Sequence, residues 1–164
     1  MPGKEESMIR KAEAKDMERI DELLSQVLDV HHQARPDLFQ KGKRKYTDNE
    51  LADILNDPSR PIFVYEKEDG QVAGYAFCIF QQYQNDNILT DIRTLYIDDL
   101  CVDRNCRHQH VGKKLYDYVC GFARENNCYN VTLNVWADNT DALKFYRSLD
   151  LHEQKIGMEK ILDY

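Results

Sequence analysis

The residues that best indicate chemistry lie in one stretch, Leu95–Tyr118, where an expected strand is followed by a polar turn and an expected helix. Leu95–Val102 mixes apolar, β-branched and acidic residues, which predicts a strand. From Val111 onward, apolar residues recur every three or four positions, as on one face of a helix. The first N–H groups of a helix lack partners within it and, with the helix dipole, favour a phosphate group. The stretch therefore predicts an anion-binding turn over Asp103–His110.

The turn itself carries a recognisable pattern. Arg107-His-Gln-His-Val-Gly112 matches the first and last positions of Arg/Gln-x-x-Gly-x-Gly/Ala. This pattern is the acetyl-CoA pyrophosphate loop of the GNAT superfamily of N-acetyltransferases, which the chain resembles from about Met8 to its C-terminus. The middle glycine of the pattern is His110 here. We expect the histidine to be tolerated, because a residue with ordinary helical dihedrals keeps its N–H in place.

A second motif of the same family follows one expected strand later. Asn139-x-x-Ala142-x-x-Phe145-Tyr146 matches Asn-x-x-Ala-x-x-Phe-Tyr. Two motifs in this order make the resemblance to the GNAT superfamily specific. It implies an α/β (α+β) GNAT fold with a mixed central sheet of about six to seven strands and helices on both faces. A splayed parallel strand pair would hold acetyl-CoA, opening near Cys101 and Val135.

The resemblance also implies which residues hold the cofactor. Backbone groups of Leu100, Cys101 and Val102 would pair with the pantetheine amides like an added strand. Asn139 would contact the pantetheine from the other side, together with Tyr146. The residues around the pyrophosphate would be Arg107, His108, Gln109, His110, Val111, Gly112 and Lys113.

Acetyl transfer from a thioester requires a neutral amine, whereas a lysine-type amine has a pKa of about 10.4. A carboxylate near the acceptor would take the proton. Asp98 and Asp99 are the candidates, and consecutive strand residues should point to opposite faces, so only one would face the acceptor. We favour Asp98, which should share a face with Leu100 and Val102. A structural role for either carboxylate remains an alternative.

Tyr146 is implied as the acid that protonates the departing thiolate. The alternative is a core tyrosine with a hydrogen-bonded hydroxyl group, and Phe145 is expected in the core. A backbone N–H near Leu100–Val102 would polarise the thioester oxygen. No acyl-cysteine intermediate is needed, so we do not expect Cys101 to be a nucleophile.

Periodicity and turn residues predict the elements that support this site. The segment His31–Phe39 either covers the acceptor site or ends a helix docked by Leu38 and Phe39. The basic run Lys41–Lys45 is expected to be a solvated loop. The expected strands are Met8–Ala14, Pro61–Glu66, Gln71–Tyr83, Ile92–Val102, Val131–Trp136 and two short ones within Leu151–Leu162. The expected helices run from near Asp16 to before Pro36, from Thr47 to Asn56, from Val111 to Glu125, and onward from Asn139.

Composition sets the remaining expectations. The 164 residues fit one domain, 8–164, behind a polar tail of residues 1–7. A net charge of −7 disfavours nucleic acid as a partner, and the lack of a long apolar run disfavours a membrane. Five cysteines without a CxxC pair predict reduced thiols, no metal and a cytoplasmic protein. The alternating strand Met158–Leu162 would leave a sheet edge, which predicts a possible homodimer.

The function predicted from these residues is transfer of an acetyl group from acetyl-CoA to a primary amine of a small molecule or peptide by direct attack. One alternative is a non-catalytic acyl-CoA-binding protein, which His110 in place of glycine would favour. Another is acetylation of a protein N-terminus or lysine.

Overall fold

The computed structural model describes residues 8–163. The expected polar tail, residues 1–7, lies outside this range. The chain divides into two compact units, the first extending to Asn134 and the second beginning at Val135. The assignment of residues 8–164 to a single domain therefore stays a prediction.

The described part of the first unit forms one mixed sheet in the order β1-β2-β3-β4-β5. Neighbours from β1 to β4 are antiparallel, and β4 and β5 are parallel. The fold class predicted from the sequence is confirmed, although the described residues contain five strands rather than six to seven. The strands are β1 (Ile9–Lys11), β2 (Ile62–Glu66), β3 (Val72–Gln82), β4 (Arg93–Val102) and β5 (Asn130–Leu133); the helices of this unit are α1 (Met17–Ala34), α2 (Asp48–Leu55) and α3 (Val111–Glu125).

Helix ends follow local chemistry. At α2, the Thr47 hydroxyl accepts from Glu50 N–H and the Glu50 carboxylate accepts from Thr47 N–H, a reciprocal capping box. Helix α1 ends before Pro36, as predicted. Asp16 stands at the α1 N-cap but does not cap it with its side chain. Its carboxylate instead accepts from Glu13 N–H and from Arg10.

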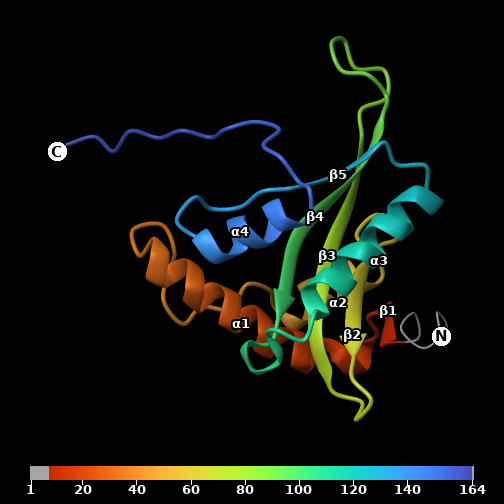
Figure 1. Cartoon of the computed structure of the whole chain (residues 1–164), viewed down its shortest axis with the longest axis vertical. Helices are drawn as coiled ribbons and strands as arrows, with labels where there is room; N and C mark the ends of the chain where they lie inside the picture. The colour runs from red at the N-terminus through yellow and green to blue at the C-terminus, as the bar shows by residue number, and fades with distance from the viewer. Residues whose placement is uncertain (1–7, 164) are drawn as a thin grey trace. The chain divides into compact units, whose positions relative to one another are not determined.

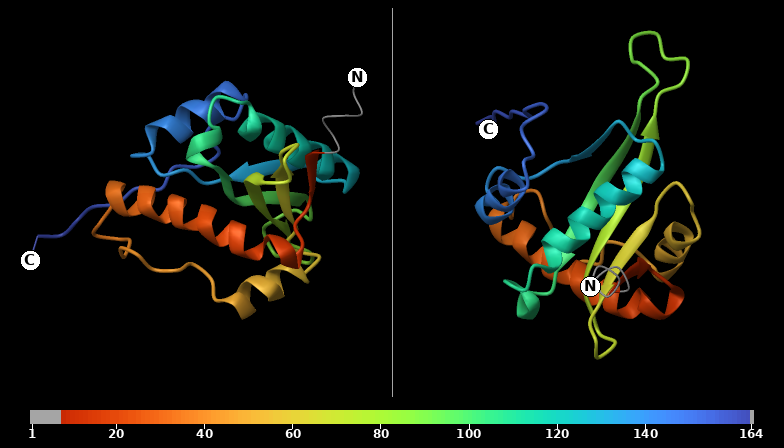
Figure 2. Two further views of the ribbon diagram at one scale, coloured as in Figure 1. Left: turned by 90° about the horizontal axis from the view of Figure 1, so that it is seen from below. Right: turned by 45° about the vertical axis from the view of Figure 1, so that its right-hand side comes forward.

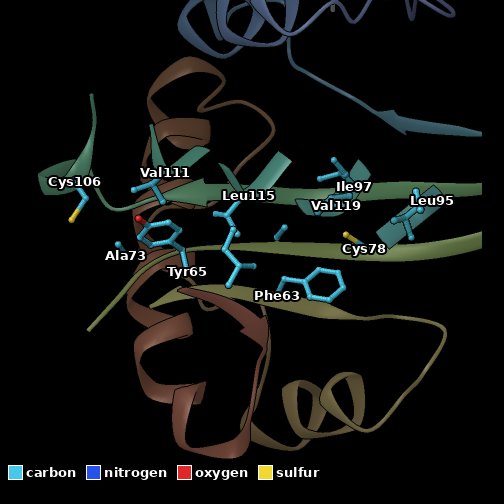
Figure 3. Close-up of a cluster of buried hydrophobic side chains, with 13 residues drawn as sticks. Phe63, Tyr65, Ala73, Cys78, Leu95, Ile97, Cys106, Val111, Leu115 and Val119 are labelled. Atoms are coloured by element: carbon cyan, nitrogen blue, oxygen red, sulfur yellow. The ribbon is translucent and has the colours of Figure 1, made fainter. Parts of the chain in front are cut away.

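The sheet separates two hydrophobic clusters, because alternate residues of each strand point to opposite faces. On β2, Phe63 and Tyr65 face α3, whereas Ile62 and Val64 face α1 and α2. Figure 2 shows α3 on one side of the sheet and α1 with α2 on the other. Figure 3 shows the α3-side cluster; its labelled residues are Phe63, Tyr65, Ala73, Cys78, Leu95, Ile97, Cys106, Val111, Leu115 and Val119.

Strands β3 and β4 form a long hairpin through the middle of the sheet (Figure 1). Gly74 on β3 pairs with Val102 at the far end of β4. A Cβ at Gly74 would lie 2.7 Å from Cys101 O and 3.2 Å from Val111 Cγ1. The absence of a side chain at Gly74 thus allows the end of β4 and the start of α3 to approach β3.

The parallel pairing of β4 with β5 is short. It runs from Thr94 opposite Asn130 to Ile97 opposite Leu133, and β4 then continues to Val102. The expected strand over Val131–Trp136 therefore ends at Leu133. Residues 98–102 of β4 extend beyond the last pair, which leaves that edge of β4 outside the parallel ladder.

The second unit contains one described helix, α4 (Thr140–Ser148). The prediction of two short strands within Leu151–Leu162 is wrong, since this described segment holds no strand. Several of its apolar side chains are exposed, including Ile156 and Met158. The homodimer was predicted from the edge of such a strand, so that argument no longer holds and the homodimer stays a prediction.

No helix within 8–163 is both long and apolar enough to cross a membrane.

Gly74→Ala should lower the free energy of unfolding by about 1–3 kcal/mol, because the new methyl group would overlap Cys101 O in a packed region. Urea denaturation measures the change. Gly121→Ala is the matched control, since a Cβ on Gly121 meets nothing within 4 Å and alanine favours the helix. Equal stability of Gly74→Ala and the natural protein would contradict the close approach.

Candidate functional site

Two carboxylates of β4 lie on the same side of the sheet. The β3–β4 register shifts between Phe77 and Cys78, which pair with Asp99 and Ile97 and leave Asp98 as the extra residue of a bulge. Both carboxylates approach one ammonium: Lys45 Nζ lies 3.8 Å from Asp98 Oδ2 and 4.0 Å from Asp99 Oδ2. The expectation that the two side chains point to opposite faces is therefore wrong.

The bulge also overturns the predicted grouping of Asp98 with Leu100 and Val102. Those two apolar side chains pack against the α3-side cluster. Asp99 pairs with Phe77, whose ring belongs to the cluster under α1 and α2. The acidic pair therefore belongs to the α1 side of the sheet, and the α3 side holds Leu100 and Val102.

Asp99 is the more enclosed carboxylate. Its side chain is 12% exposed, against 31% for Asp98. The Tyr75 hydroxyl donates to Asp99 Oδ2 at 2.6 Å, and Tyr75 itself is fully buried. Burial raises the pKa of Asp99; the hydrogen bond from Tyr75 and the charge of Lys45 oppose this without cancelling it. A carboxylate with a raised pKa has the proton affinity that a general base needs.

Lys45 differs from the rest of the basic run Lys41–Lys45, which was expected to be a solvated loop, because its side chain makes contacts. Lys41, Lys43 and Lys45 are all exposed residues, but the Lys45 side chain is 33% exposed, and its Nζ lies 5.3 Å from the centre of the Tyr46 ring. Burial alone would lower the pKa of Lys45, yet the charges of Asp99 and Asp98 help to raise it overall. Lys45 is thus held as an ammonium against the acidic pair.

The end of α1 borders the same cluster. The rings of His31 and Phe39 stack with centres 5.0 Å apart, and Phe39 O lies 2.8 Å from His32 Nδ1. Burial is the main cause that lowers the pKa of His31, and the nearby charge of Asp99 opposes it. Leu38 is 51% exposed, so it does not dock the helix end. The segment His31–Phe39 therefore combines a docked ring with a histidine close to the acidic pair.

The predicted phosphate turn has the expected position, with one difference in its backbone. Helix α3 begins at Val111, and His110 occupies its N-cap with φ 62° and ψ 18°. His108 also has positive φ, at 67°. The expectation of ordinary helical dihedrals at His110 is wrong. The histidine adopts the left-handed conformation that glycine adopts without strain.

The turn is anchored at both ends. Cys106 and Val111 are buried, while Arg107, His108, Gln109 and His110 between them are exposed. The first N–H groups of α3, from Val111 to Lys113, precede the point at which intrahelical hydrogen bonds begin. The Lys113 ammonium pairs with Asp117 at 2.6 Å. The turn therefore presents backbone donors to solvent, while the buried residues at its two ends hold it in place.

Asp103 holds the start of this turn in place, a role that the sequence did not indicate. Its buried carboxylate accepts from Arg19, from Asn105 N–H at 3.1 Å and from Gln26 Nε2 at 3.4 Å. Burial would raise the pKa of Asp103, but the hydrogen bonds from Asn105, Arg19 and Gln26 lower it overall. Arg19 also donates to Val72 O at 2.9 Å. These contacts fasten α1 to the end of β4.

Cys101 packs in the α1-side cluster and its Sγ lies 3.6 Å from Leu23 O. Burial raises the pKa of Cys101 to about 12. The thiolate is the nucleophilic form of cysteine, so a thiol with this pKa is unreactive near neutrality. The expectation that Cys101 is not a nucleophile stays a prediction.

Asn139 and Tyr146 belong to the second unit, in which Asn139 caps α4. Its Oδ1 accepts from Ala142 N–H at 3.2 Å. The Phe145 and Tyr146 rings lie 5.3 Å apart, and both side chains are only partly buried. Phe145 was expected in the core, but α4 contains no fully buried residue. The roles of Asn139 and Tyr146 stay predictions.

Sequence reasoning missed Lys45, Tyr75 and Asp103. Tyr75 occurs in an almost wholly apolar strand, Val72–Gln82, where a tyrosine hydroxyl needs a buried partner. The position of Tyr75 in this strand could therefore have indicated a buried polar partner. No such indication existed for Lys45, because a lysine in a basic run resembles a solvated residue. Within 8–163, no three or more His, Cys, Asp or Glu side chains are grouped to hold a metal ion.

Comparison with known proteins identifies the family of the chain. The family described as the acetyltransferase (GNAT) family matches residues 24–150. A curated relative from Lactobacillus delbrueckii subsp. lactis, called "Uncharacterized N-acetyltransferase in pepI 3'region", is 32% identical over 90 residues. The match covers 55% of this chain and 51% of the relative, so the chain spans about half the length of that relative.

Two solved structures are similar over nearly the whole chain. A single-substitution variant of the BH1408 protein from Bacillus halodurans has a TM-score of 0.90 at 25% identity, covering 94% of this chain and 98% of that one. The glucosamine-6-phosphate N-acetyltransferase of Arabidopsis thaliana has a TM-score of 0.67 at 25% identity, covering 94% and 97%. The chain belongs to the acetyltransferase (GNAT) family, which places it among the acyltransferases.

His110→Gly should raise the free energy of unfolding by up to about 1 kcal/mol, because relief of the left-handed backbone outweighs the entropy of glycine in the unfolded chain. Urea denaturation measures this change. Gln109→Gly is the matched control, since Gln109 is not among the residues with positive φ and glycine there should not stabilise. A loss of stability for His110→Gly would show that the imidazole has a role of its own.

Gly112→Val should weaken CoA binding ten-fold or more, about 1.4 kcal/mol, because a branched side chain in the first turn of α3 crowds the pyrophosphate. Calorimetric titration with CoA measures the affinity. Gly121→Val places the same substitution nine residues later on the same helix and should leave CoA affinity unchanged. Unchanged affinity in Gly112→Val would contradict the assignment of the loop.

Proposed function

We propose that this chain transfers an acetyl group from acetyl-CoA to a primary amine by direct attack of the amine on the thioester. The observation that carries the proposal is the pairing of Asp98 and Asp99 around an ammonium, at the point where β4 extends beyond its pairing with β5. An amine acceptor needs a cation-binding acidic group and a base, and one bulge supplies both.

The cofactor would lie along β4 and across the start of α3. Backbone groups of Leu100, Cys101 and Val102 would pair with the pantetheine arm, because this part of β4 continues past Leu133 of β5. The N–H groups from His108 to Lys113 would hold the pyrophosphate, with Arg107 beside it. Asn139 would contact the pantetheine from the other side.

Asp99 is proposed as the general base, which replaces the preference for Asp98 from the sequence. Its enclosure and raised pKa suit proton removal from an ammonium, and Tyr75 fixes its orientation. Asp98, which is more exposed, would attract the ammonium of the acceptor. A backbone N–H near Leu100 would stabilise the oxyanion.

Tyr146 is proposed to protonate the CoA thiolate as it leaves. A thiol is a far better leaving group than a thiolate ion in a low-dielectric site, so a nearby hydroxyl donor would accelerate collapse of the tetrahedral intermediate.

Acceptors of the proposed reaction are small molecules or peptides with a primary amine. Aminosugar phosphates deserve early testing, since the Arabidopsis thaliana neighbour is a glucosamine-6-phosphate N-acetyltransferase. Acceptors on a protein N-terminus or lysine fit the same chemistry.

We also propose that the protein is cytoplasmic, because all five cysteines are free thiols. We propose in addition a homodimer that covers the exposed apolar residues near Ile156 and Met158.

Release of CoA with a panel of primary amines (aminosugar phosphates, aminoglycosides, polyamines, amino acids and peptides) tests the function. For the best acceptor, Asp99→Asn should lower kcat by on the order of 10²–10⁴. Asp98→Asn is the matched control and should mainly raise KM. A larger loss of kcat in Asp98→Asn would assign the base to Asp98. CoA binding without release by any amine would favour the acyl-CoA-binding alternative.

Tyr146→Phe should lower kcat by on the order of 10²–10⁴ while leaving the melting temperature and CoA affinity unchanged, because only the proton donor is lost. Tyr129→Phe, at an exposed tyrosine of the first unit, should change none of the three quantities. Loss of stability with normal turnover in Tyr146→Phe would instead identify a structural tyrosine.

A further inference from the structure

The acidic pair already holds a primary amine that belongs to the chain. Lys45 Nζ lies within 4.0 Å of a carboxylate oxygen from both Asp98 and Asp99. The Lys45 stem is partly covered, and the Tyr46 ring that it contacts stacks on Phe77 with centres 6.0 Å apart. Phe77 is in turn the β3 partner of Asp99. Lys45 is therefore placed by packing as well as by charge.

We propose that Lys45 is a site of self-acetylation, at which the chain transfers the acetyl group of acetyl-CoA to its own side chain. The inference rests on the proposed function. An acceptor is expected to bring an alkyl ammonium to Asp98 and Asp99, and the Lys45 side chain is that chemical group in that position. Despite burial, the acidic pair raises the pKa of Lys45, which disfavours its neutral form. Tethering opposes this, because it sets an effective concentration at the base far above that of a dissolved amine.

The step balances without a further reactant. Asp99 takes one proton from the Lys45 ammonium and passes it to solvent. The neutral nitrogen then attacks the carbonyl carbon of the thioester, so that a C–N bond forms and the C–S bond breaks. The second proton of the attacking nitrogen ends on the CoA thiolate. The products are an amide at Lys45 and free CoA thiol.

Neighbouring lysines provide an internal comparison. Lys43 is exposed and lies two residues before Lys45 on the same loop. Lys113 lies in the first turn of α3, where its ammonium pairs with Asp117 at 2.6 Å. Spontaneous acetylation by acetyl-CoA should favour exposed lysines such as Lys43. Faster acetylation of Lys45 than of Lys43 would therefore show that Asp98 and Asp99 promote the reaction.

Acetylation would also change the site. The amide has no charge, so Asp98 and Asp99 would lose the cation that now pairs with them. An acetylated Lys45 side chain would remain where the acceptor amine is expected. Self-acetylation should therefore slow turnover of added amines, which makes Lys45 a brake when acetyl-CoA is abundant and acceptor is scarce.

The test uses the full chain, shown by intact mass to be unmodified, incubated with acetyl-CoA and no acceptor. Peptide mass spectrometry follows acetylation at each lysine over time. We expect Lys45 to react at least ten times faster than Lys43, at a rate per molecule that does not depend on protein concentration. Asp99→Asn should remove this preference, with its melting temperature recorded as a check on folding. Lys43→Arg is the matched control and should leave Lys45 acetylation unchanged.

A second arm needs no substitution. An added amine that the protein turns over should slow acetylation of Lys45, because both compete for Asp98 and Asp99. Equal rates at Lys45 and Lys43, or a Lys45 rate unaffected by a productive acceptor, would overturn the inference. Normal turnover of added amines with Lys45 unmodified would reject self-acetylation alone. Bound CoA without transfer to any amine or to Lys45 would reject the proposed function as well.

Discussion

The bulge that inserts Asp98 into β4 is the constraint on which the site depends. Without it, strict alternation would direct one of the two carboxylates into the apolar cluster beneath α3, where an ion has no partner. With it, Asp98 and Asp99 both approach Lys45, and Asp99 meets the hydroxyl of Tyr75. The residues that follow return to alternation, so that Leu100 and Val102 pack on the α3 side while Cys101 packs under α1. One extra residue thus keeps both carboxylates on the α1 side of the sheet.

The same strand links this acidic surface to the phosphate turn. Asp103 comes directly after β4, and its carboxylate binds Arg19 and Gln26 of α1. Gly74 lets the end of β4 and the start of α3 lie against β3. The proposed base and the proposed pyrophosphate site are therefore held by one continuous segment. Their separation is fixed by the sheet rather than by a mobile loop.

The sequence predicted the parts of this arrangement that depend on local chemistry. The bounds of α3, Val111–Glu125, follow from its apolar spacing, and Thr47 caps α2 through Glu50. The register shift at Phe77 was not predictable, because it depends on how two strands pair. Lys45 was misjudged because its contacts come from residues far along the chain. The expected strands within Leu151–Leu162 have suitable alternation, but alternation forms a strand only when a partner strand is present.

The most direct test of this description is the pKa of Asp99, measured by carbon-13 NMR of labelled aspartate carboxyl groups and assigned with Asp99→Asn. Burial should raise this pKa above the ordinary value of about 3.9, and Lys45→Met should raise it further, because a compensating charge is lost. A raised pKa means that the native state holds this proton more tightly than the unfolded chain, so the contribution of Asp99 to stability falls as pH rises through that range. A pKa at or below the ordinary value, unchanged by Lys45→Met, would contradict an enclosed base paired with Lys45.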